Sequence, residues 1–582
     1  MAKRTKAFLA IALCVTLLFT SVTGVAATVA TEESTEITTE APVEEAKGNA
    51  FMEGFANALN TIFNKVVDTL LDTIVKFFPK TVLIKDKSEY KSENFMEGTK
   101  DFIDEPVEDA RWNLGYAQAS IVPEDFDDVK YYKGGYDLNL KLTEMIDDLK
   151  VRVVTLNDGS DRGTTAIIAI DCLGLANSDV RLIRAALADY AEANNIVSIN
   201  VSATHVHSGI DTQGIYTDLF TTIFQNLFAA ITKSDNLAPA IDNEFRQVII
   251  DKSAECVKAA FESMTEGTLT YAKTNAANYV RDRTAPDIMM EDIYRLMFTP
   301  DDGSTGTIIT NFGVHPETIG FGTKVGTSDF VYYTEQLINE AGYNFLFLQG
   351  AVGTYTEDQG SSSDGLELDR IEATIRYGEE LGYILLGMTM TVEERIALLV
   401  DEEREAIAID NEDYSPWYER ETVTEVEVAP VLNVAHKEFL APVDNGVYEL
   451  FGKLSLANNT MVTDADGKYY AVTEAGYIEL GHLKLILCPG ETYAELIKGG
   501  ENMADFKFAP AYEILGTEDV IVCDLVNDAL GYIMPDNFFT YATIRYEDEA
   551  ITIDSSWGLT SLGDTAASNI YGAIYDLIDE VR

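Results

Sequence analysis

Residues 164–171 read TTAIIAID and residues 196–205 read IVSINVSATH, and these two stretches decide the fold. Each is a run of apolar, often β-branched residues with the length of a strand, and residues 180–194 between them have the spacing of a helix. Runs of the same kind follow at 308–315, 345–350, 483–491 and 520–527. Strands that alternate with helices predict an α/β domain with mixed, partly parallel sheets flanked by helices.

The main domain is expected to span residues 110–560. Within it, residues 408–480 carry β-branched and aromatic runs such as ETVTEVEVAPVLNV, which predict an antiparallel β-rich insertion. Residues 364–400 predict one long helix, and residues 561–582 predict a C-terminal helix.

A further helix is expected before the main domain, in the segment 51–109, which continues as a connector. Its apolar residues recur at spacings of three and four, at Phe51, Phe55, Leu59, Ile62, Val66, Leu70 and Ile74. This is the pattern of an amphipathic helix. The apolar stripe either packs on the main domain or lies on a lipid surface. Few lysines are available to meet anionic headgroups, so the expected membrane contact is weak.

The N-terminus has the three parts of a secretory signal peptide, expected at residues 1–27. Lys3, Arg4 and Lys6 are basic, residues 8–19 are apolar, and residues 25–27 are small. This predicts a secreted or extracellular protein, either released or held at the cell surface, with a retained anchor as the alternative. Residues 28–50 begin rich in Thr and Glu and predict a solvated linker, because such a segment buries little apolar surface.

Charge and cysteine content narrow the classes of partner. The formal net charge is −55 at pH 7, which disfavours a nucleic-acid partner because phosphate backbones would be repelled. Cys172, Cys256, Cys488 and Cys523 remain after signal cleavage and form no CxxC pair. They are expected to be buried free thiols, with one disulfide as the alternative.

Three of the five histidines follow apolar strands, and the carboxyl ends of strands are where α/β sheets bind ligands. His205 and His207 stand two apart in ATHVHSG, so an extended strand would turn both imidazoles to one side. One of them can bind a metal while the other orients water or substrate. His315 ends the run NFGVH, and Pro316 stops strand pairing directly after it. His436 and His482 are given no role.

A carboxylate completes a zinc-like ligand set. Glu491 lies in LCPGET, where Pro489 and Gly490 form a turn after a strand. Imidazole and carboxylate ligands without thiolate are typical of catalytic rather than structural zinc. Zinc (Zn²⁺) would lower the pKa of a bound water to about 7 and polarise a carbonyl. Tyr532, in NDALGY, follows the last strand and by itself is a packed tyrosine.

The motifs ATHVHSG, NFGVHPET, CPGET and NDALGY resemble, in this order and rough spacing, those of the neutral, non-lysosomal ceramidases. The resemblance covers roughly residues 110–560. It implies a zinc ion held by His205, His315, Glu491 and Tyr532, with His207 facing the substrate or the zinc-bound water. Spacing alone leaves open which of the two neighbouring histidines binds the metal.

The sequence departs from that family in two places. The family's GDxSPN motif corresponds here to residues 350–358, GAVGTYTED, in which Thr354 replaces the Asp and Thr356 replaces the Ser. Thr356 either keeps a catalytic hydroxyl or is an inert loop residue, and Glu357 or Asp358 is then a candidate general base. The immunoglobulin-like domain that follows the catalytic domain in the ceramidases is not expected here.

The resulting hypothesis is a secreted, zinc-dependent hydrolase of linear amides that acts on an N-acyl lipid or related N-acyl compound, with His207 and Thr356 as catalytic candidates. Arg281 and Arg283, in NYVRDR, are candidates for holding a polar substrate group, or they form surface ion pairs. Two alternatives stay open. One is a zinc esterase or amidase with a non-sphingolipid substrate, and the other is a catalytically inactive cell-surface binding protein on the same fold.

Overall fold

The computed structural model describes residues 43–81, 83–99, 101–129, 131–284, 288–357, 369–398, 417–500, 503, 505–547, 550–555 and 557–582. The expected signal peptide, residues 28–42 of the expected linker and Asp358 lie outside these residues. No helix in the described part of the chain is long and apolar enough to span a bilayer.

Most of the chemistry-bearing residues follow strands of a large mixed sheet, in which the described residues form nine strands. The order is β12-β10-β9-β7-β2-β4-β5-β6, and β14 pairs with β7. The pairs β5–β6 and β10–β12 are parallel, whereas β2–β4, β4–β5, β7–β9 and β9–β10 are antiparallel. The strands are β2 (Trp112–Ser120), β4 (Lys150–Asn157), β5 (Thr164–Ile170), β6 (Ile196–Ala203), β7 (Thr265–Asn275), β9 (Asp292–Pro300), β10 (Gly306–Phe312), β12 (Tyr343–Gln349) and β14 (Val426–Glu427).

A second sheet, of six strands in the described part, supplies the remaining strand ends. Antiparallel pairing joins β15 to β17 and β17 to β18, and β18 pairs with β20 in parallel. The strands are β1 (Lys85–Asp86), β15 (Leu432–Pro442), β16 (Met461–Thr463), β17 (Tyr469–Leu480), β18 (Leu483–Leu487) and β20 (Val520–Cys523). Within 408–480, β15, β16 and β17 belong to this second sheet together with β1, β18 and β20, whereas β14 pairs with β7 of the larger sheet. Helix α11 (Gly446–Leu454) lies between β15 and β16 in the chain.

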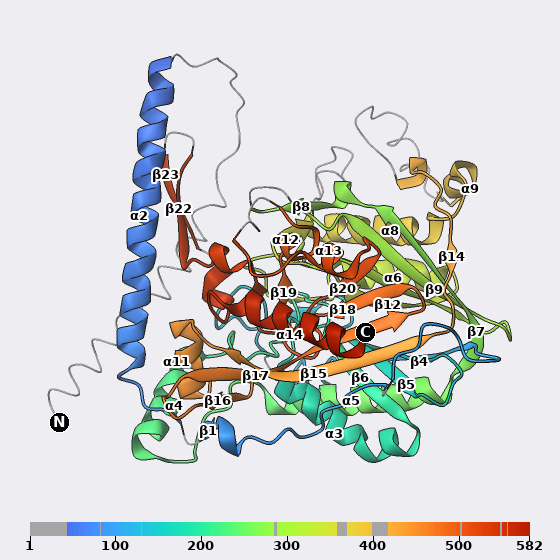
Figure 1. Ribbon diagram of the computed structural model, residues 1–582, viewed down its shortest axis with the longest axis horizontal. Helices are drawn as coiled ribbons and strands as arrows, with labels where there is room; N and C mark the ends of the chain where they lie inside the picture. Colours follow the sequence, from blue (N-terminus) through green and yellow to red (C-terminus); the bar gives the residue numbers. More distant parts are fainter. Residues whose placement is uncertain are drawn as a thin grey trace.

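The two sheets face each other and are covered by helices on both outer sides (Figure 1). Aliphatic side chains of both sheets, such as Leu296 and Leu485, share one core between them. Helices α3 (Asn177–Ala193) and α5 (Asn243–Glu262) pack on the outer face of the larger sheet, and α6 (Phe330–Glu340) and α8 (Arg370–Gly387) pack near its β10–β12 edge. Helix α14 (Ala566–Val581) covers the smaller sheet. The predicted class, an α/β fold with mixed, partly parallel sheets flanked by helices, is confirmed.

The elements end earlier than the sequence indicates. Strand β6 ends at Ala203, β10 at Phe312, β18 at Leu487 and β20 at Cys523. At each of these points the backbone leaves the ladder before the end of the predicted strand and enters a turn or loop. The single helix expected at 364–400 is divided in the described residues into α8 and α9 (Val392–Ile396), because Thr391 starts a new helix with a capping box.

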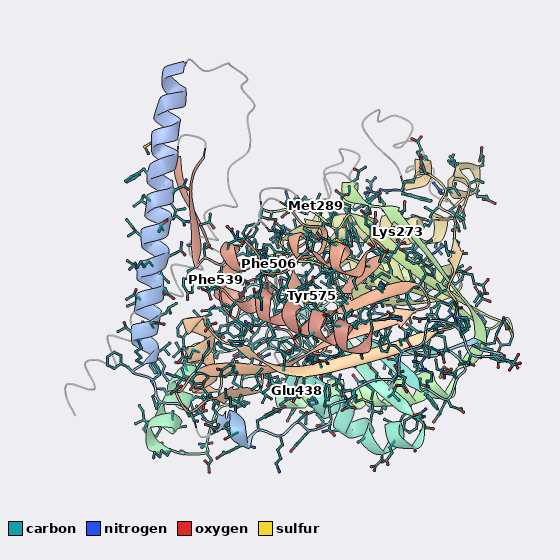
Figure 2. All side chains as sticks on the ribbon, viewed as in Figure 1. Lys273, Met289, Glu438, Phe506, Phe539 and Tyr575 are labelled. Carbon is teal, nitrogen blue, oxygen red and sulfur yellow. The ribbon has the colours of Figure 1, made fainter. Side chains whose placement is uncertain are left out.

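Helix α2 (Val43–Val75) stands beside the hairpin of β22 (Ala542–Glu547) and β23 (Ala550–Ser555), as Figure 1 shows. Asn64 ties them together by hydrogen bonds with the backbone of Ala542. The buried face of α2 carries Ala56, Val67 and Leu71. Most of the predicted apolar stripe lies elsewhere and is solvent-exposed: Phe55 is 46%, Ile62 61%, Val66 59% and Leu70 39% exposed. Side chains project from α2 away from the body (Figure 2).

Candidate metal centre

The turn after β6 carries the first two histidines. His205 has a positive φ of 69°, a left-handed conformation that costs energy for a residue with a Cβ, and its N–H donates to the Cys172 carbonyl at 3.0 Å. The two imidazoles therefore do not share one face of an extended strand, as the spacing predicted. They meet because the chain turns sharply at His205, which brings the two Nε2 atoms to 3.3 Å.

The turn after β10 carries His315. Its N–H donates to the Tyr355 carbonyl at 3.4 Å, and it forms an isolated parallel bridge with Thr356. Thr356 belongs to the short strand β13 (Tyr355–Glu357), which pairs with β8 (Val280–Asp282). Residues 355–357, in the segment expected to correspond to the GDxSPN motif, thus lie directly against the His315 turn.

The ends of β18 and β20 bring Glu491 and Tyr532 together. The two residues are directly paired between the short parallel strands β19 (Glu491–Thr492) and β21 (Tyr532–Ile533). Asp524 accepts hydrogen bonds from the N–H and the hydroxyl of Thr492, both at 2.6 Å. Gly531 has a φ of 75°, and a Cβ at this position would lie 1.6 Å from the carbonyl oxygen of Thr560, so only glycine fits before Tyr532.

Three histidines and one carboxylate converge in these turns. Glu491 Oε2 lies 3.5 Å from His205 Nε2 and 3.4 Å from His315 Nε2. One ring nitrogen from each of His205, His207 and His315 lies within 4.8 Å of the other two. Ligand atoms around a tetrahedral zinc with bonds of about 2.0–2.2 Å are about 3.3–3.6 Å apart. His315 Nε2 and Glu491 Oε2 are buried and have no hydrogen-bond partner among the described residues. The residues present fit a divalent cation.

The hydrogen bonds of the His205 and His315 imidazoles turn the Nε2 atom of each ring toward Glu491 Oε2. His205 Nδ1 lies 2.7 Å from the Leu173 carbonyl, and His315 Nδ1 is hydrogen-bonded to the Tyr355 carbonyl. A carbonyl only accepts, so Nδ1 carries the proton and the Nε2 lone pair faces inward.

Burial favours the neutral form of the His315 and His207 imidazoles. It lowers the pKa of His315 to about 4 and that of His207 well below its usual value. Burial alone raises the pKa of Glu491, and attraction to His205 and His315 lowers it to about 2 in the state in which those imidazoles carry a proton. A neutral imidazole and an ionised carboxylate are the forms that bind metal.

Tyr532 lies beside Glu491 in the strand pairing and is buried against aromatic rings. Its ring centroid is 5.1 Å from that of Trp557 and 6.4 Å from that of Tyr493. Burial raises its pKa well above the usual value, and the neighbouring Glu491 carboxylate acts in the same direction.

Thr356 is held between two carboxyl groups. Its hydroxyl lies 2.6 Å from Glu317 Oε1 and 2.7 Å from Glu357 Oε2. Glu317 is a site residue that the sequence analysis missed. The signal for it was its position two residues after His315, on the same turn.

The two arginines differ in their surroundings. Arg283 Nη1 donates to Glu317 Oε1 at 3.0 Å, and its guanidinium stacks on Trp557 at 4.6 Å. Arg281 pairs through its backbone with Thr356, and its side chain is exposed. Arg283 therefore supports Glu317, and Arg281 is the arginine that is open to solvent.

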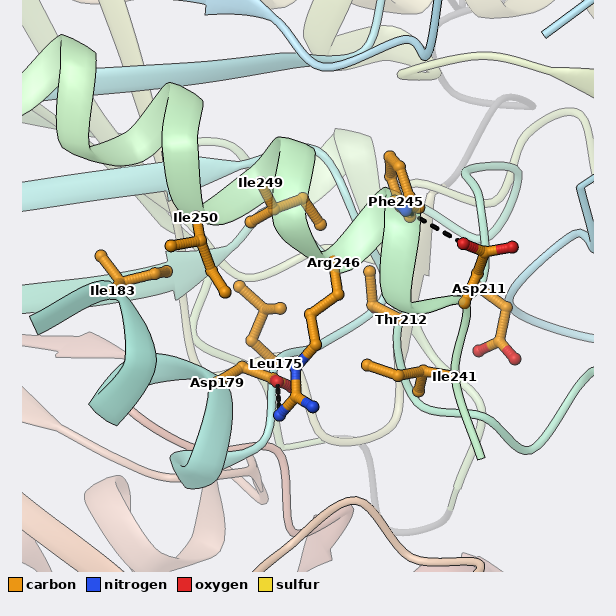
Figure 3. A pocket seen from close by; sticks show the side chains of 11 residues that line it. Leu175, Asp179, Ile183, Asp211, Thr212, Ile241, Phe245, Arg246, Ile249 and Ile250 are labelled. Carbon is orange, nitrogen blue, oxygen red and sulfur yellow. Dashed lines mark hydrogen bonds and ion pairs between the residues drawn. The ribbon is translucent and has the colours of Figure 1, made fainter. Parts of the chain in front are cut away.

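The other chemistry-bearing residues lie outside the cluster. His436 Nε2 is 2.9 Å from the Ser198 hydroxyl, and Cys172, Cys256, Cys488 and Cys523 are buried free thiols. A separate small pocket between α3 and α5 is lined mainly by aliphatic side chains, with the Asp179–Arg246 ion pair beside them (Figure 3). None of the predicted site residues lines that pocket.

Fold and cluster together define an α/β sandwich with a buried candidate metal site at its strand ends. The fold is that of the neutral ceramidases. The crystal structure of the neutral ceramidase from Pseudomonas aeruginosa matches with a TM-score of 0.53 and 15% sequence identity, covering 81% of this chain and 74% of that chain. A ceramidase structure described as complexed with C2 matches with a TM-score of 0.54 and 15% identity, covering 81% and 75%.

The sequence by itself carries no such match. No protein-family profile matches the chain, and no curated protein matches it. The resemblance predicted from four short motifs is therefore confirmed at the level of the fold.

Proposed function

We propose that this chain is an exported, zinc-dependent hydrolase of linear amide bonds, with an N-acyl lipid or a related N-acyl compound as substrate. The observation that carries the proposal is the convergence of two histidines on one carboxylate. Glu491 Oε2 lies 3.5 Å from His205 Nε2 and 3.4 Å from His315 Nε2. Tyr532, paired with Glu491, is the fourth proposed ligand.

The chain's own residues have separate tasks. The bound zinc would supply an acidified water and polarise the substrate carbonyl. His205, His315 and Glu491 hold the ion, and their buried positions exclude bulk water. His207 Nε2, 3.3 Å from His205 Nε2, is placed to take a proton from the attacking water and return it to the leaving nitrogen. Arg281, exposed at the β8 strand, is the candidate to meet a polar substrate group.

The decisive experiment combines metal analysis with a substrate panel. We expect about one zinc per chain after gentle purification, and hydrolysis of ceramide or simple N-acyl amides that a chelator abolishes and zinc restores. Full activity after chelation would refute the zinc mechanism. A chain with no bound metal and no hydrolysis would support the alternative of an inactive binding protein.

A specific observation favours a second candidate, an esterase or amidase with a non-sphingolipid substrate. The Thr356 hydroxyl, at the position of the ceramidase serine, is engaged by two carboxyl groups. A site altered at this position is expected to accept a different substrate. Faster turnover of a p-nitrophenyl ester or a short N-acyl amide than of ceramide would favour this candidate.

Contact with a lipid surface is the proposed role of α2. Its stripe of Phe55, Ile62, Val66 and Leu70 is exposed. Helix α4 (Leu219–Thr232), packed in the same hydrophobic cluster as the end of α2, has no charged residue and also exposes large apolar side chains, at Phe220, Phe224, Phe228 and Ile231. Such faces bind the interfacial region of a bilayer.

Vesicle flotation tests this contact. The strong negative charge predicts binding to phosphatidylcholine vesicles rather than to vesicles rich in anionic lipid. The double variant Ile62→Ser, Val66→Ser should float less than wild type. The control double variant Thr69→Ser, Thr73→Ser, at exposed positions of α2, should float to the same extent as wild type. Equal flotation of all three proteins would refute the role of α2.

A further inference from the structure

His207 and Glu317 contain two buried atoms that lack hydrogen-bond partners and face each other. His207 Nδ1 lies 3.9 Å from Glu317 Oε2, and neither atom has a hydrogen-bond partner among the described residues. The separation is about 1 Å longer than an N–H···O hydrogen bond. Both side chains are almost fully buried, 9% and 7% exposed, so water is a poor substitute for a partner.

The surrounding contacts keep the two groups in this relation. The His207 N–H donates to the Pro316 carbonyl at 3.1 Å, which fastens the turn of His207 to the residue before Glu317. The other carboxylate oxygen of Glu317 receives hydrogen bonds from Arg283 and Thr356, at 3.0 and 2.6 Å. The ring of Tyr136 packs on the His207 imidazole with 4.7 Å between centroids. Oε2 is thus the free acceptor of an otherwise fixed carboxylate.

The group that faces His207 Nδ1 is a carboxyl group, whereas the acceptors for Nδ1 of His205 and His315 are backbone carbonyls. His205 and His315 direct Nδ1 at backbone carbonyls, those of Leu173 and Tyr355. An ionised carboxylate makes an imidazole a stronger base than a neutral carbonyl does, because it stabilises the positive charge that the ring gains with a proton. Burial and the nearby Glu357 raise the pKa of Glu317 well above its usual value, and the hydrogen bond from Thr356 and the ion pair with Arg283 act in favour of the ionised form. The two histidines with carbonyl partners also flank Glu491, whereas His207 is hydrogen-bonded to His205 and its ring lies edge-on to that of His315, with 5.3 Å between centroids.

We propose that Glu317 is the positioning residue of His207: it accepts the Nδ1–H and leaves the Nε2 lone pair directed at the cluster as the proton acceptor of the reaction. This assignment rests on the proposed hydrolase function, in which His205 binds the metal and His207 is the base. The water oxygen bonds to the carbonyl carbon, one water proton moves to His207 Nε2, the C–N bond breaks, and that proton passes to the leaving nitrogen. The products are a carboxylic acid and an amine.

The same geometry gives Thr356 a supporting role. Its hydroxyl lies against Glu317 and Glu357 and helps to hold the carboxylate that orients His207. Arg283 holds the same oxygen from the other side. The residue at the position of the ceramidase serine therefore contributes through Glu317 rather than by bonding to the substrate.

Histidine NMR tests the pairing without any need for activity. In protein labelled with ¹⁵N-histidine, loaded with zinc, an Nδ1–H signal of His207 is expected far downfield, and the variant His207→Gln assigns it. In Glu317→Gln the signal should shift clearly upfield, because a charged acceptor becomes a neutral one. The matched control Glu425→Gln, which removes the carboxylate that accepts from the buried Arg295 away from the site, should leave the signal unchanged.

Kinetics provide the second readout. In Glu317→Gln, kcat should fall by about 10- to 100-fold, with KM and zinc content little changed, and Glu317→Asp should restore part of the loss. A His207 Nδ1–H signal that is unchanged in Glu317→Gln would overturn the proposal. Wild-type protein that hydrolyses no amide or ester, yet shows a Glu317-dependent signal, would refute the hydrolase function and leave the pairing standing.

Discussion

Replacing Glu491 by Gln should separate the stability of the fold from the binding of metal. In the metal-free protein, Glu491 Oε2 and His315 Nε2 are buried atoms 3.4 Å apart, and neither has a hydrogen-bond partner in the part of the chain that the structure describes. An unsatisfied buried polar group costs about 1–3 kcal/mol. Because His315 Nε2 carries a lone pair, the amide of a glutamine can donate to it. The variant in chelator should therefore be more stable than wild type by about 1–2 kcal/mol.

The expected temperature shifts follow from the size of the chain. Unfolding entropy of about 2.1 cal/mol/K per residue gives about 1.2 kcal/mol/K for 582 residues, so the gain raises Tm by about 1–2 °C. Zinc at about 100 times its Kd should stabilise the wild type by about 2.7 kcal/mol, a further rise of about 2 °C. Glu491→Gln should lose most of this zinc-dependent rise, since the amide replaces a charged ligand.

Differential scanning calorimetry with and without chelator measures both effects. Glu335→Gln is the contrasting variant, because Glu335 is fully buried and paired with Arg152 at 2.6 Å. Removing a partner from a buried ion pair costs about 3–5 kcal/mol, so this variant should lose stability with and without zinc. A Glu491→Gln protein that is less stable than wild type in chelator, or that keeps the full zinc-dependent rise, would refute the reasoning.

Three further changes should have distinct effects. Burial lowers the pKa of His436 to about 4, so only the unfolded chain takes up this proton as pH falls from 6.5 to 4. Stability is full above pH 6.5, and about 3 kcal/mol is lost by pH 4; His436→Gln should make Tm measured against pH shallower, and an unchanged slope would contradict this. Thr356→Val should lower kcat about tenfold without abolishing it, since Thr356 supports Glu317; complete loss of steady-state activity would instead indicate a nucleophile. Gly531→Ala, whose Cβ would meet the Thr560 carbonyl, should cost about 3 kcal/mol or more and weaken zinc binding, as thermal unfolding and zinc titration would show.

The sequence indicates which candidate residues come together better than it indicates their geometry. His205, His315 and Glu491 could be singled out because each follows an apolar strand, with Pro316 directly after His315 and Pro489 and Gly490 directly before Glu491. The left-handed backbone of His205 could not, because no residue type marks it: glycine would be the usual choice at a φ of 69°. Glu317 escaped notice for a related reason. A single carboxylate in a polar turn has no pattern, and only the folded chain shows that it is buried between Arg283 and Thr356.

The stripe on α2 shows a different limit of sequence reasoning. Periodicity indicates that a helix has an apolar face, but it does not say what that face contacts. In α2 the side toward the body carries Val67 and Leu71 together with Asn64, whose hydrogen bonds to the hairpin backbone replace apolar packing. The larger residues of the stripe point outward. The side of α2 that packs on the body is therefore the side with the polar Asn64 contact, and not the side with the larger apolar residues.

The left-handed turn at His205 is supported by a buried network of hydrogen bonds. The preceding residue, Thr204, donates to Asp171 at 3.1 Å, and Asp171 also accepts from Arg152 and from Ser328, at 2.8 Å each. These groups are fully buried, so the network cannot exchange its bonds for water without unfolding the sheet. The energy of the left-handed residue is therefore offset by contacts beneath it. A cluster of unpaired nitrogen and oxygen atoms can persist in a stable fold only with such support, and a bound cation would supply the partners that those atoms lack.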